Sequence, residues 1–258
     1  MQTATVSRTP LRVVPSEAAT LPPVRKFEVT CSGCGMREFC LPKGLDGEDL
    51  ARVEQLVYAR RRLRRGEALF RAGDEFSAMY AIRSGFFKTT TISDDGREQV
   101  TGFQMPGELL GMDGIGAGRY NGTAIALEDS VVCVMPFALI EEMSQAVPAL
   151  QRQLHAVLAR EIVRDHGVMM LLGSMRAEER LATFLINLSK RFVRRGYSSS
   201  DFHLRMTREE IGSYLGLKLE TVSRAFSGFQ DRGLTEVRQK HVRILDFPGL
   251  KAVLGQKC

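Results

Sequence analysis

Short runs of apolar residues dominate the sequence between about residues 53 and 134, and turn-forming residues separate them. Runs of strand length stand at 78–82 and at 131–134. Asp94-Asp95-Gly96 predicts a hairpin turn, because Asp and Gly accept the positive φ angles that tight hairpins need. Many short strands at regular spacing are typical of an all-β barrel or jelly roll. The pattern therefore predicts a β domain in the first half of the chain.

From Pro136 onward the apolar spacing becomes helical. Pro136 suits the first turn of a short helix, and Pro148 suits the first turn of a long helix that runs to about Leu172. An amphipathic helix is expected over residues 176–194, and residues 234–245 fit a small hairpin. The chain is therefore assigned to the α+β class.

The long helix carries a stripe of residues at heptad-like spacing: His155, Leu158, Ile162, Asp165, Met169 and Leu172. Such a stripe fits either ordinary core packing or a seam against an identical helix. Asp165 is unfavourable in both settings. Across a two-fold axis it would face its own copy, and two like charges close together repel.

Residues 206–226 carry the strongest local signal, which is that of a helix-turn-helix. Thr207 and Glu210 predict a capping box at the start of the first helix, and Gly216 supplies the sharp turn after it. The second helix presents three polar side chains near its N-terminal end: Glu220, Ser223 and Arg224. A recognition helix enters the major groove of DNA in this way, where Arg can bind guanine and Glu can accept from cytosine. The alternative is a plain helical hairpin with solvated charges.

The distribution of charge also favours a nucleic-acid partner. The net charge is +6. Residues 171–258 hold 16 Lys and Arg against nine Asp and Glu, whereas residues 1–170 hold 20 Lys and Arg against 21 Asp and Glu. A basic domain beside a near-neutral one suits contact with phosphates, although a merely solvated basic surface would have the same charge. Three basic residues of the expected C-terminal hairpin would form a wing against the DNA backbone: Arg238, Lys240 and Arg243.

Other classes of protein find less support. No apolar run approaches the roughly 18 residues that span a bilayer, and the N-terminus lacks an apolar signal segment, so a cytoplasmic protein without membrane contact is expected. No nucleophile–base pair or Gly-rich phosphate loop stands out, so an enzyme is the least favoured class. The histidines are scattered along the chain: His155, His166, His203 and His241.

Four cysteines form a second candidate site. Cys31, Cys34 and Cys40 are separated by two and five residues, and Cys133 lies far along the chain on a predicted strand. Disulfides are rare in the cytosol, and four thiolates could hold either Zn²⁺ or an iron–sulfur cluster. Structural zinc sites usually use two close pairs, so a triplet with a remote fourth thiol favours a cluster, while inert structural cysteines stay open as an alternative. Cys258 is expected to take no part.

Several segments together resemble the CRP/FNR family of bacterial regulators and, within it, the oxygen-sensing FNR/ANR branch. The likeness covers about residues 31–245. Besides the cysteine triplet it rests on LFRAGD at 69–74, YAIRSG at 80–85, EQVTGF at 98–103, AEERL at 177–181 and ETVSR at 220–224.

The resemblance, with the proline-rich composition of the N-terminus, implies five regions. They are a disordered tail (1–27), a cysteine-rich cluster-binding segment (28–45), a jelly-roll-like β-roll sensor domain (46–145), a dimerisation helix (146–173) and a winged helix-turn-helix DNA-binding domain (174–258).

The resemblance also implies an oxygen-responsive mechanism. A [4Fe–4S] cluster is expected on the four cysteines Cys31, Cys34, Cys40 and Cys133. The intact cluster would support a homodimer that binds a palindromic DNA site, and oxygen would convert the cluster and separate the dimer. Asp165 matches an interface carboxylate whose repulsion keeps the cluster-free protein monomeric, and the remaining interface residues are Leu158, Ile162 and Met169.

On the DNA side, the resemblance assigns base reading to Glu220, Ser223 and Arg224 and implies a half-site like TTGAT. Lys218 stands where the family places a capping Ser or Thr, so we expect a weaker cap and a phosphate contact. Thr207 completes the expected DNA-binding residues. The resemblance of the 94–97 turn to an activating loop implies contact with RNA polymerase.

A cyclic nucleotide is not expected as the signal. The loop at 107–111 resembles the phosphate-binding cassette of the cyclic-AMP relatives, but Gly122 stands where those proteins place an arginine, and Arg119 is a poor substitute. Two alternatives stay open: a regulator switched by a small molecule in the β-roll, and one switched by zinc or thiol redox chemistry.

Overall fold

The computed structural model describes residues 30–57 and 59–255, and the predicted tail at 1–27 and Cys258 lie outside these ranges. The described chain begins with the cysteine segment, which contains η1 (Arg37–Phe39) and is followed by α1 (Gly47–Glu54). The sequence patterns did not predict α1. It is only two turns long and buries just Leu50 and Val53, so it leaves little periodicity to detect.

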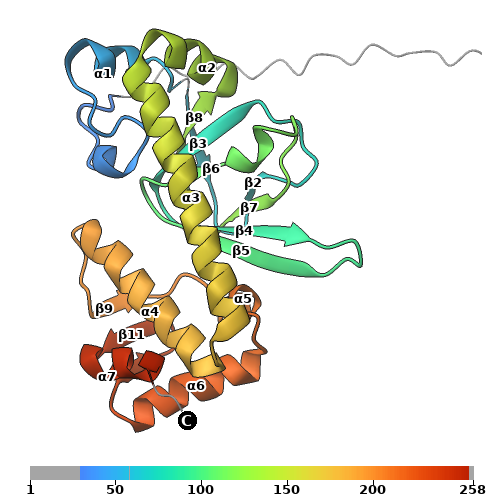
Figure 1. The fold of residues 1–258 in the computed structure, drawn as a ribbon, viewed down its shortest axis with the longest axis vertical. Helices are drawn as coiled ribbons and strands as arrows, with labels where there is room; N and C mark the ends of the chain where they lie inside the picture. The colour runs from blue at the N-terminus through green and yellow to red at the C-terminus, as the bar shows by residue number, and fades with distance from the viewer. Residues whose placement is uncertain (1–29, 58, 256–258) are drawn as a thin grey trace, which may run out of the picture.

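Two four-stranded antiparallel sheets then form the predicted β-roll (Figure 1). One sheet has the order β1-β8-β3-β6, which are Ala59–Leu63, Ser130–Pro136, Ala78–Ser84 and Leu109–Leu110. The other has the order β2-β7-β4-β5, which are Ala68–Phe70, Thr123–Ala126, Phe87–Ile92 and Glu98–Gln104. A short 3-10 helix, η2 (Met112–Gly114), follows β6. The prediction of a jelly-roll-like domain is confirmed.

The hairpin of β4 and β5 projects from the β-roll, with the predicted turn at its tip (Figure 1). Gly96 has a φ of +81° and donates its N–H to the carbonyl of Ser93. At the base of the hairpin, the N–H of Val100 donates to Ser213 Oγ (2.8 Å), and Lys88 pairs with Glu210 (3.0 Å). The base of the hairpin therefore contacts the C-terminal domain, and its tip extends into solvent.

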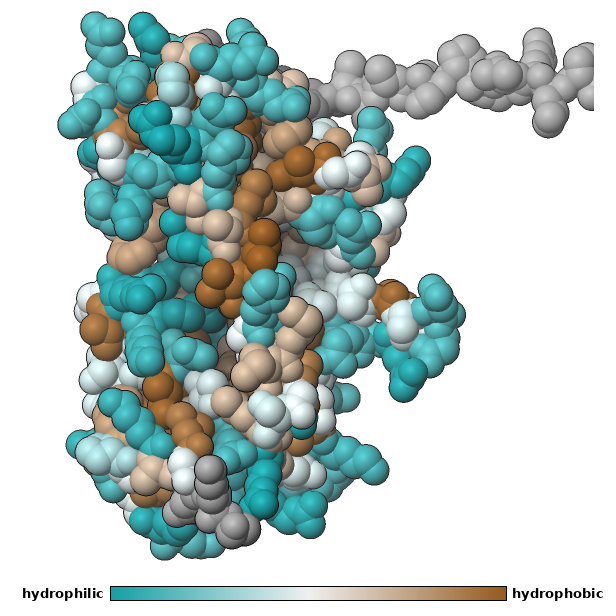
Figure 2. All heavy atoms as spheres, viewed as in Figure 1, coloured by the Kyte–Doolittle hydropathy of each residue, from teal (hydrophilic) through white to brown (hydrophobic). Residues whose placement is uncertain are grey.

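Helix α2 (Phe137–Ala146) follows the β-roll, and α3 (Pro148–Ser174) then runs the length of the molecule to the C-terminal domain (Figure 1). Pro148 occupies the first turn of α3, as predicted. The inner side of α3 buries Leu150, Val157 and Leu171. Part of its outer side carries exposed hydrophobic residues, which gather over the middle of the molecule in Figure 2.

The C-terminal domain is a helical bundle with a small sheet. Its elements are α4 (Ala177–Arg194), β9 (Asp201–His203), α5 (Arg208–Leu215), α6 (Leu219–Asp231), β10 (Thr235–Arg238), β11 (His241–Ile244), α7 (Phe247–Ala252) and η3 (Val253–Gly255). The predicted hairpin is β10 and β11, and β9 adds an edge strand that the sequence did not predict, because three residues carry no alternation. Across the described ranges, no helix is long and apolar enough to cross a membrane.

The β-roll and the C-terminal domain share one hydrophobic core. Phe86, Phe103 and Met105 of the β-roll pack in the same cluster as α4 and α5 residues such as Phe184 and Leu215. The two domains are therefore joined by buried apolar contacts in this conformation of the chain.

Candidate metal centre and nucleic-acid interface

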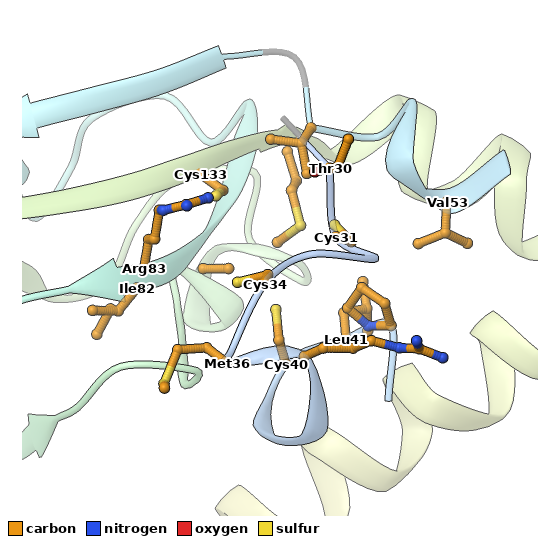
Figure 3. A pocket seen from close by; sticks show the side chains of 15 residues that line it. Thr30, Cys31, Cys34, Met36, Cys40, Leu41, Val53, Ile82, Arg83 and Cys133 are labelled. Carbon is orange, nitrogen blue, oxygen red and sulfur yellow. The ribbon is translucent and has the colours of Figure 1, made fainter. Parts of the chain in front are cut away.

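The structure brings the four predicted cysteines to one cavity. Cys31, Cys34 and Cys40 come from the loop around η1, and Cys133 comes from β8 (Figure 3). The loop curls through backbone hydrogen bonds from Cys34 N–H to the carbonyl of Cys31 and from Cys40 N–H to that of Arg37, each 3.1 Å. These turns bring all three thiols of the loop to the cavity wall, opposite the strand that bears Cys133.

Burial favours the protonated form of three of these thiols, Cys31, Cys40 and Cys133. Burial, reinforced by the neighbouring Cys133 and Glu54, raises the pKa of Cys31 to about 11. Burial raises the pKa of Cys40 to about 12. It also raises the pKa of Cys133, against the opposing effect of Arg60 and Arg83. Binding of a metal centre must therefore displace protons, which makes its affinity depend on pH.

Four thiols around one cavity are a donor set that either a zinc ion or an iron–sulfur cluster can use. Within the described residues, no group of three or more His, Cys, Asp or Glu side chains is placed to hold one metal ion. A zinc ion needs four ligands about 2.0–2.3 Å from one point. The thiolates of a [4Fe–4S] cluster each bind a different iron, so they need to surround a cavity instead.

Two buried arginine atoms at this site lack an acceptor. Arg37 lines the cavity and donates one guanidinium nitrogen to the carbonyl of Leu45, but its Nε is buried without a partner. Arg60 lies opposite Cys133 in the pairing of β1 with β8, and its Nε is also buried without a partner. Both guanidinium groups place positive charge at the thiol site, where Arg60 also hydrogen-bonds Cys133, and positive charge there suits an anionic cluster. Sequence reasoning missed both arginines.

The helix-turn-helix has the predicted local geometry. The N–H of Glu210 donates to Thr207 Oγ1 (3.1 Å), and the N–H of Thr207 donates to Glu210 Oε2 (2.7 Å), which completes the capping box. Gly216 ends α5 with a φ of +62°. In α6, Val222 and Phe226 are buried, whereas the three predicted base-reading residues are exposed: Glu220, Ser223 and Arg224.

Lys218 stands at the N-cap of α6 and makes no side-chain hydrogen bond to the helix. In the wing, Arg238 is exposed and pairs with Glu236 (2.6 Å), while Lys240 donates to the carbonyl of Arg205 (2.9 Å). Sequence reasoning missed Arg208, whose guanidinium lies 3.4 Å from the centre of the Phe226 ring. That contact ties α5 to α6 and sets the angle of the second helix.

The predicted interface stripe on α3 is largely at the surface. Ile162 and Met169 are 56% and 60% exposed, Asp165 is exposed, and Leu158 is half-buried. Core packing within one chain is therefore the wrong interpretation for the middle of the stripe. The residues of α3 that are buried are others, such as Val157.

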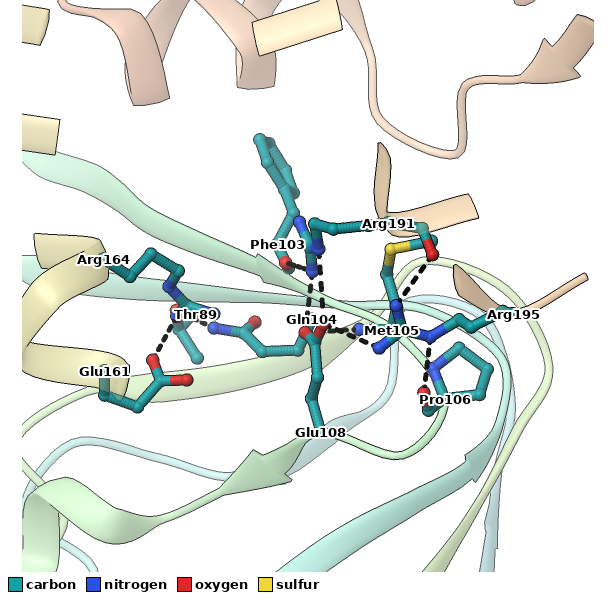
Figure 4. A network of polar contacts seen from close by, with 10 residues as sticks. All are labelled: Thr89, Phe103, Gln104, Met105, Pro106, Glu108, Glu161, Arg164, Arg191 and Arg195. Atoms are coloured by element: carbon teal, nitrogen blue, oxygen red, sulfur yellow. Dashed lines mark hydrogen bonds and ion pairs between the residues drawn. The ribbon is translucent and has the colours of Figure 1, made fainter. Parts of the chain in front are cut away.

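A polar network joins the β-roll to α4 (Figure 4). Glu108, just before β6, pairs with Arg191 (2.7 Å) and Arg195 (2.8 Å). Arg191 also donates to the carbonyl of Phe103 (2.6 Å), and Arg195 donates to that of Pro106 (2.7 Å). Burial alone would raise the pKa of Glu108, but the two arginines outweigh it and hold that pKa below its usual value. No local pattern in the sequence marks this network, because its partners lie more than 80 residues apart.

A cavity of about 660 Å³ lies between the β-roll and α3. Asp113 occupies part of it and accepts hydrogen bonds from the backbone N–H groups of Asn121 (2.9 Å) and Gly122 (2.8 Å). Arg119 does not line this cavity and donates to the carbonyl of Gly73 instead (2.7 Å). In this cavity the Asp113 carboxylate therefore occupies the backbone N–H groups of Asn121 and Gly122.

Comparison with known proteins identifies the β-roll and the helix-turn-helix. Residues 60–146 match the cyclic nucleotide-binding domain model, and residues 179–253 match the Crp-like helix-turn-helix model. The chain is 48% identical to the transcriptional activator protein FnrA of Stutzerimonas stutzeri, over 87% of this chain and 92% of the relative. It is 40% identical to the fumarate and nitrate reduction regulatory protein of Salmonella typhimurium, over 88% and 91%. FixK2 of Bradyrhizobium japonicum has a similar structure, with a TM-score of 0.70 and 27% identity over 78% and 98% of the two chains.

Proposed function

Because the chain belongs to the CRP/FNR family of helix-turn-helix transcription regulators, with FNR- and ANR-like relatives, we propose that it senses oxygen through a [4Fe–4S] cluster. The ligands would be Cys31, Cys34, Cys40 and Cys133. The observation that carries this proposal is the convergence of these four thiols, from two remote segments, on one cavity with the positive charge of Arg37 and Arg60 beside it. Inert structural cysteines would give no reason for that convergence.

When bound, the cluster would supply an oxygen-sensitive link between the cysteine loop and β8. The residues around the cluster connect this site to α3. Leu41 and Leu45 of the cysteine loop pack in the same hydrophobic cluster as Leu150 and Val157 of α3. A change in the position of the loop can therefore reach the helix through the packed side chains of this cluster.

Helix α3 would then pair with its copy in a homodimer. Ile162 and Met169 provide apolar surface for a seam, and Asp165 places a carboxylate between them. Without the cluster, repulsion between the two Asp165 carboxylates would keep the chains apart. In the cluster-bound dimer, the two Asp165 carboxylates must lie where their repulsion is weaker than the attraction between the apolar residues of the seam.

The dimer would bind a palindromic DNA site with TTGAT-like half-sites about one helical turn, roughly 34 Å, apart. Arg224 would bind guanine, Glu220 would accept from cytosine, and Ser223 would contact a further base. Lys218, at the N-cap of α6, and Thr207, at the N-cap of α5, would contact phosphates. The exposed tip of the β4–β5 hairpin, residues 94–97, would contact RNA polymerase and allow activation or repression of anaerobic genes.

The signal would not be a cyclic nucleotide, although the β-roll matches the domain model of that name. Asp113 blocks the backbone donors at Asn121 and Gly122, and its charge repels a phosphate. The size of the neighbouring cavity favours a small-molecule signal as the second candidate, which the following experiment separates from the first.

Purification without oxygen tests the proposal. The wild-type protein should be brown, with about four irons and four sulfides per chain. A Cys133→Ser variant should lose most of its iron and its anaerobic DNA binding, whereas Cys258→Ser, which alters the cysteine left out of the site, should keep both. A colourless wild-type protein that binds DNA would contradict the proposal and favour a small-molecule signal. One zinc per chain would favour a zinc-based switch.

A further inference from the structure

A strongly basic cavity of about 520 Å³ lies where the cysteine loop, the loop before β6, α3 and α4 meet. We name it the basic junction. Six basic side chains line it: Lys43, Arg160, Arg164, Arg191, Arg194 and Arg195. The proposed cluster does not use these residues, and they do not belong to the helix-turn-helix.

The carboxylates of the basic junction neutralise only half of this charge. Glu108 is shared by two arginines, as described above, and Glu161 pairs with Arg164 (2.7 Å). The only other acidic residue in the described lining is Glu38. Counted as formal charges, six cations and three anions leave an excess of three positive charges in one cavity.

Three of the cations have no counterion in the described part of the chain. Lys43, Arg160 and Arg194 make no ion pair with a described residue, and all three are exposed to the cavity or its rim. Burial lowers the pKa of Arg195, and repulsion from Arg191 and Arg194 adds to the effect, although Glu108 opposes it. The positive potential of the junction is therefore not satisfied by the described residues themselves.

The geometry points to a small polyphosphate anion, of the class of pyrophosphate or the phosphate chain of a nucleotide, as the ligand of the basic junction. Guanidinium groups bind phosphate oxygens through paired, charge-assisted hydrogen bonds. The unpaired cations come from three separate elements, so one ligand must offer several charged groups to reach them. A chain of phosphates meets that requirement, and a single carboxylate does not.

The place of the junction in the fold makes DNA phosphates a less suitable ligand. The N-terminal part of α4 lies beside α6, where Glu178 pairs with Arg232 (2.7 Å). Arg191, Arg194 and Arg195 lie at the opposite end of α4, against the β-roll (Figure 1). An anion bound there would bridge the cysteine loop, α3 and the DNA-binding domain, and would therefore be linked to the state of the sensor.

Calorimetric titration of the full-length protein with sodium pyrophosphate, at constant ionic strength, tests this inference. We expect saturable binding of one pyrophosphate per chain, and weaker binding of orthophosphate. An Arg160→Gln/Arg194→Gln double variant should bind more weakly by roughly tenfold for each charge-assisted hydrogen bond that it removes. Because these side chains are exposed and unpaired, the variant should keep the thermal stability of the wild type without ligand.

Arg152→Gln is the matched control, since Arg152 is an exposed arginine of α3 outside the junction. It should bind pyrophosphate as the wild type does. The inference would be overturned by absence of saturable binding, by equal binding in the double variant, or by an equally weakened control. Reduced DNA affinity in the double variant, with no pyrophosphate binding by the wild type, would identify the junction as a DNA contact and would also overturn it.

Discussion

Single residues carry the two functions that we propose for this protein, and each residue depends on its immediate surroundings. Arg224 is free to reach a base because Val222 and Phe226, on the other side of α6, bury that helix against the domain. Arg208 holds Phe226 from the other helix. The side chains that we propose to read bases are therefore held by a buried apolar support, which selectivity between base pairs requires.

Replacing Arg224 by Ala should relax the preference for one base pair in each half-site. A bidentate contact between Arg and guanine discriminates by about 1–3 kcal/mol. Binding of the active dimer to a panel of singly substituted sites measures the effect. Arg238→Ala, which removes an exposed wing arginine, should instead weaken binding to all sites alike. Unchanged base preference in the Arg224 variant would exclude Arg224 as a base reader.

Among the helices, strands and loops, those with a local signal were predictable from the sequence. The capping box of Thr207 and Glu210, the 94–96 turn and the long α3 each follow from spacing and turn chemistry. The four cysteines could also be grouped, because thiols have few other uses in this pattern. Arg37 and Arg60 could not be assigned to the same site, since arginines are common and only the fold places these two beside the thiols.

Helix α3 is the element that we expect to set the oligomeric state. Replacing Asp165 by Ala removes the proposed repulsion, so the cluster-free variant should dimerise in air, whereas the aerobic wild type stays monomeric. Asp165→Glu keeps the charge and should behave like the wild type. Sedimentation velocity of the aerobic proteins measures the outcome. An Asp165→Ala protein that sediments as a monomer would refute the repulsion mechanism.

In the molecule as a whole, the β-roll and the DNA-binding domain are joined by a shared core and by the ion pairs of Glu108. The Arg195 side chain is only 4% exposed. Removal of its partner would leave a buried charge uncompensated. The sequence could not predict this junction, because Glu108 lies in a loop that resembles a ligand-binding segment and pairs instead with arginines of the α4 region.

Glu108→Gln should therefore lower the free energy of unfolding by about 3–5 kcal/mol. Glu236→Gln, which breaks an exposed ion pair in the wing, should cost less than about 1 kcal/mol. Urea denaturation of both variants makes the comparison. A decrease in Glu108→Gln no larger than in the Glu236 variant would show that the network does not hold the domains together.

Because Glu108 is charged in the folded state, we expect the stability of the protein to depend on pH. The folded-state pKa of Glu108 lies below its usual 4.5. Its contribution to the free energy of unfolding is therefore complete above about pH 4.5 and is lost as the pH falls through the folded-state pKa. The stability of the wild type should therefore decline more steeply below pH 4.5 than that of Glu108→Gln. Parallel curves for the two proteins would argue against a charged Glu108 in the folded state.

We propose above all that the state of the four-cysteine site controls DNA binding through α3. A single anaerobic sample can decide this, if its DNA binding and sedimentation are measured before and after exposure to air, with iron and sulfide determined at both points. We predict a cluster-containing dimer that binds the palindrome, and then a cluster-free monomer that does not. A protein that loses its iron and sulfide in air but stays dimeric and bound to DNA would contradict the proposal.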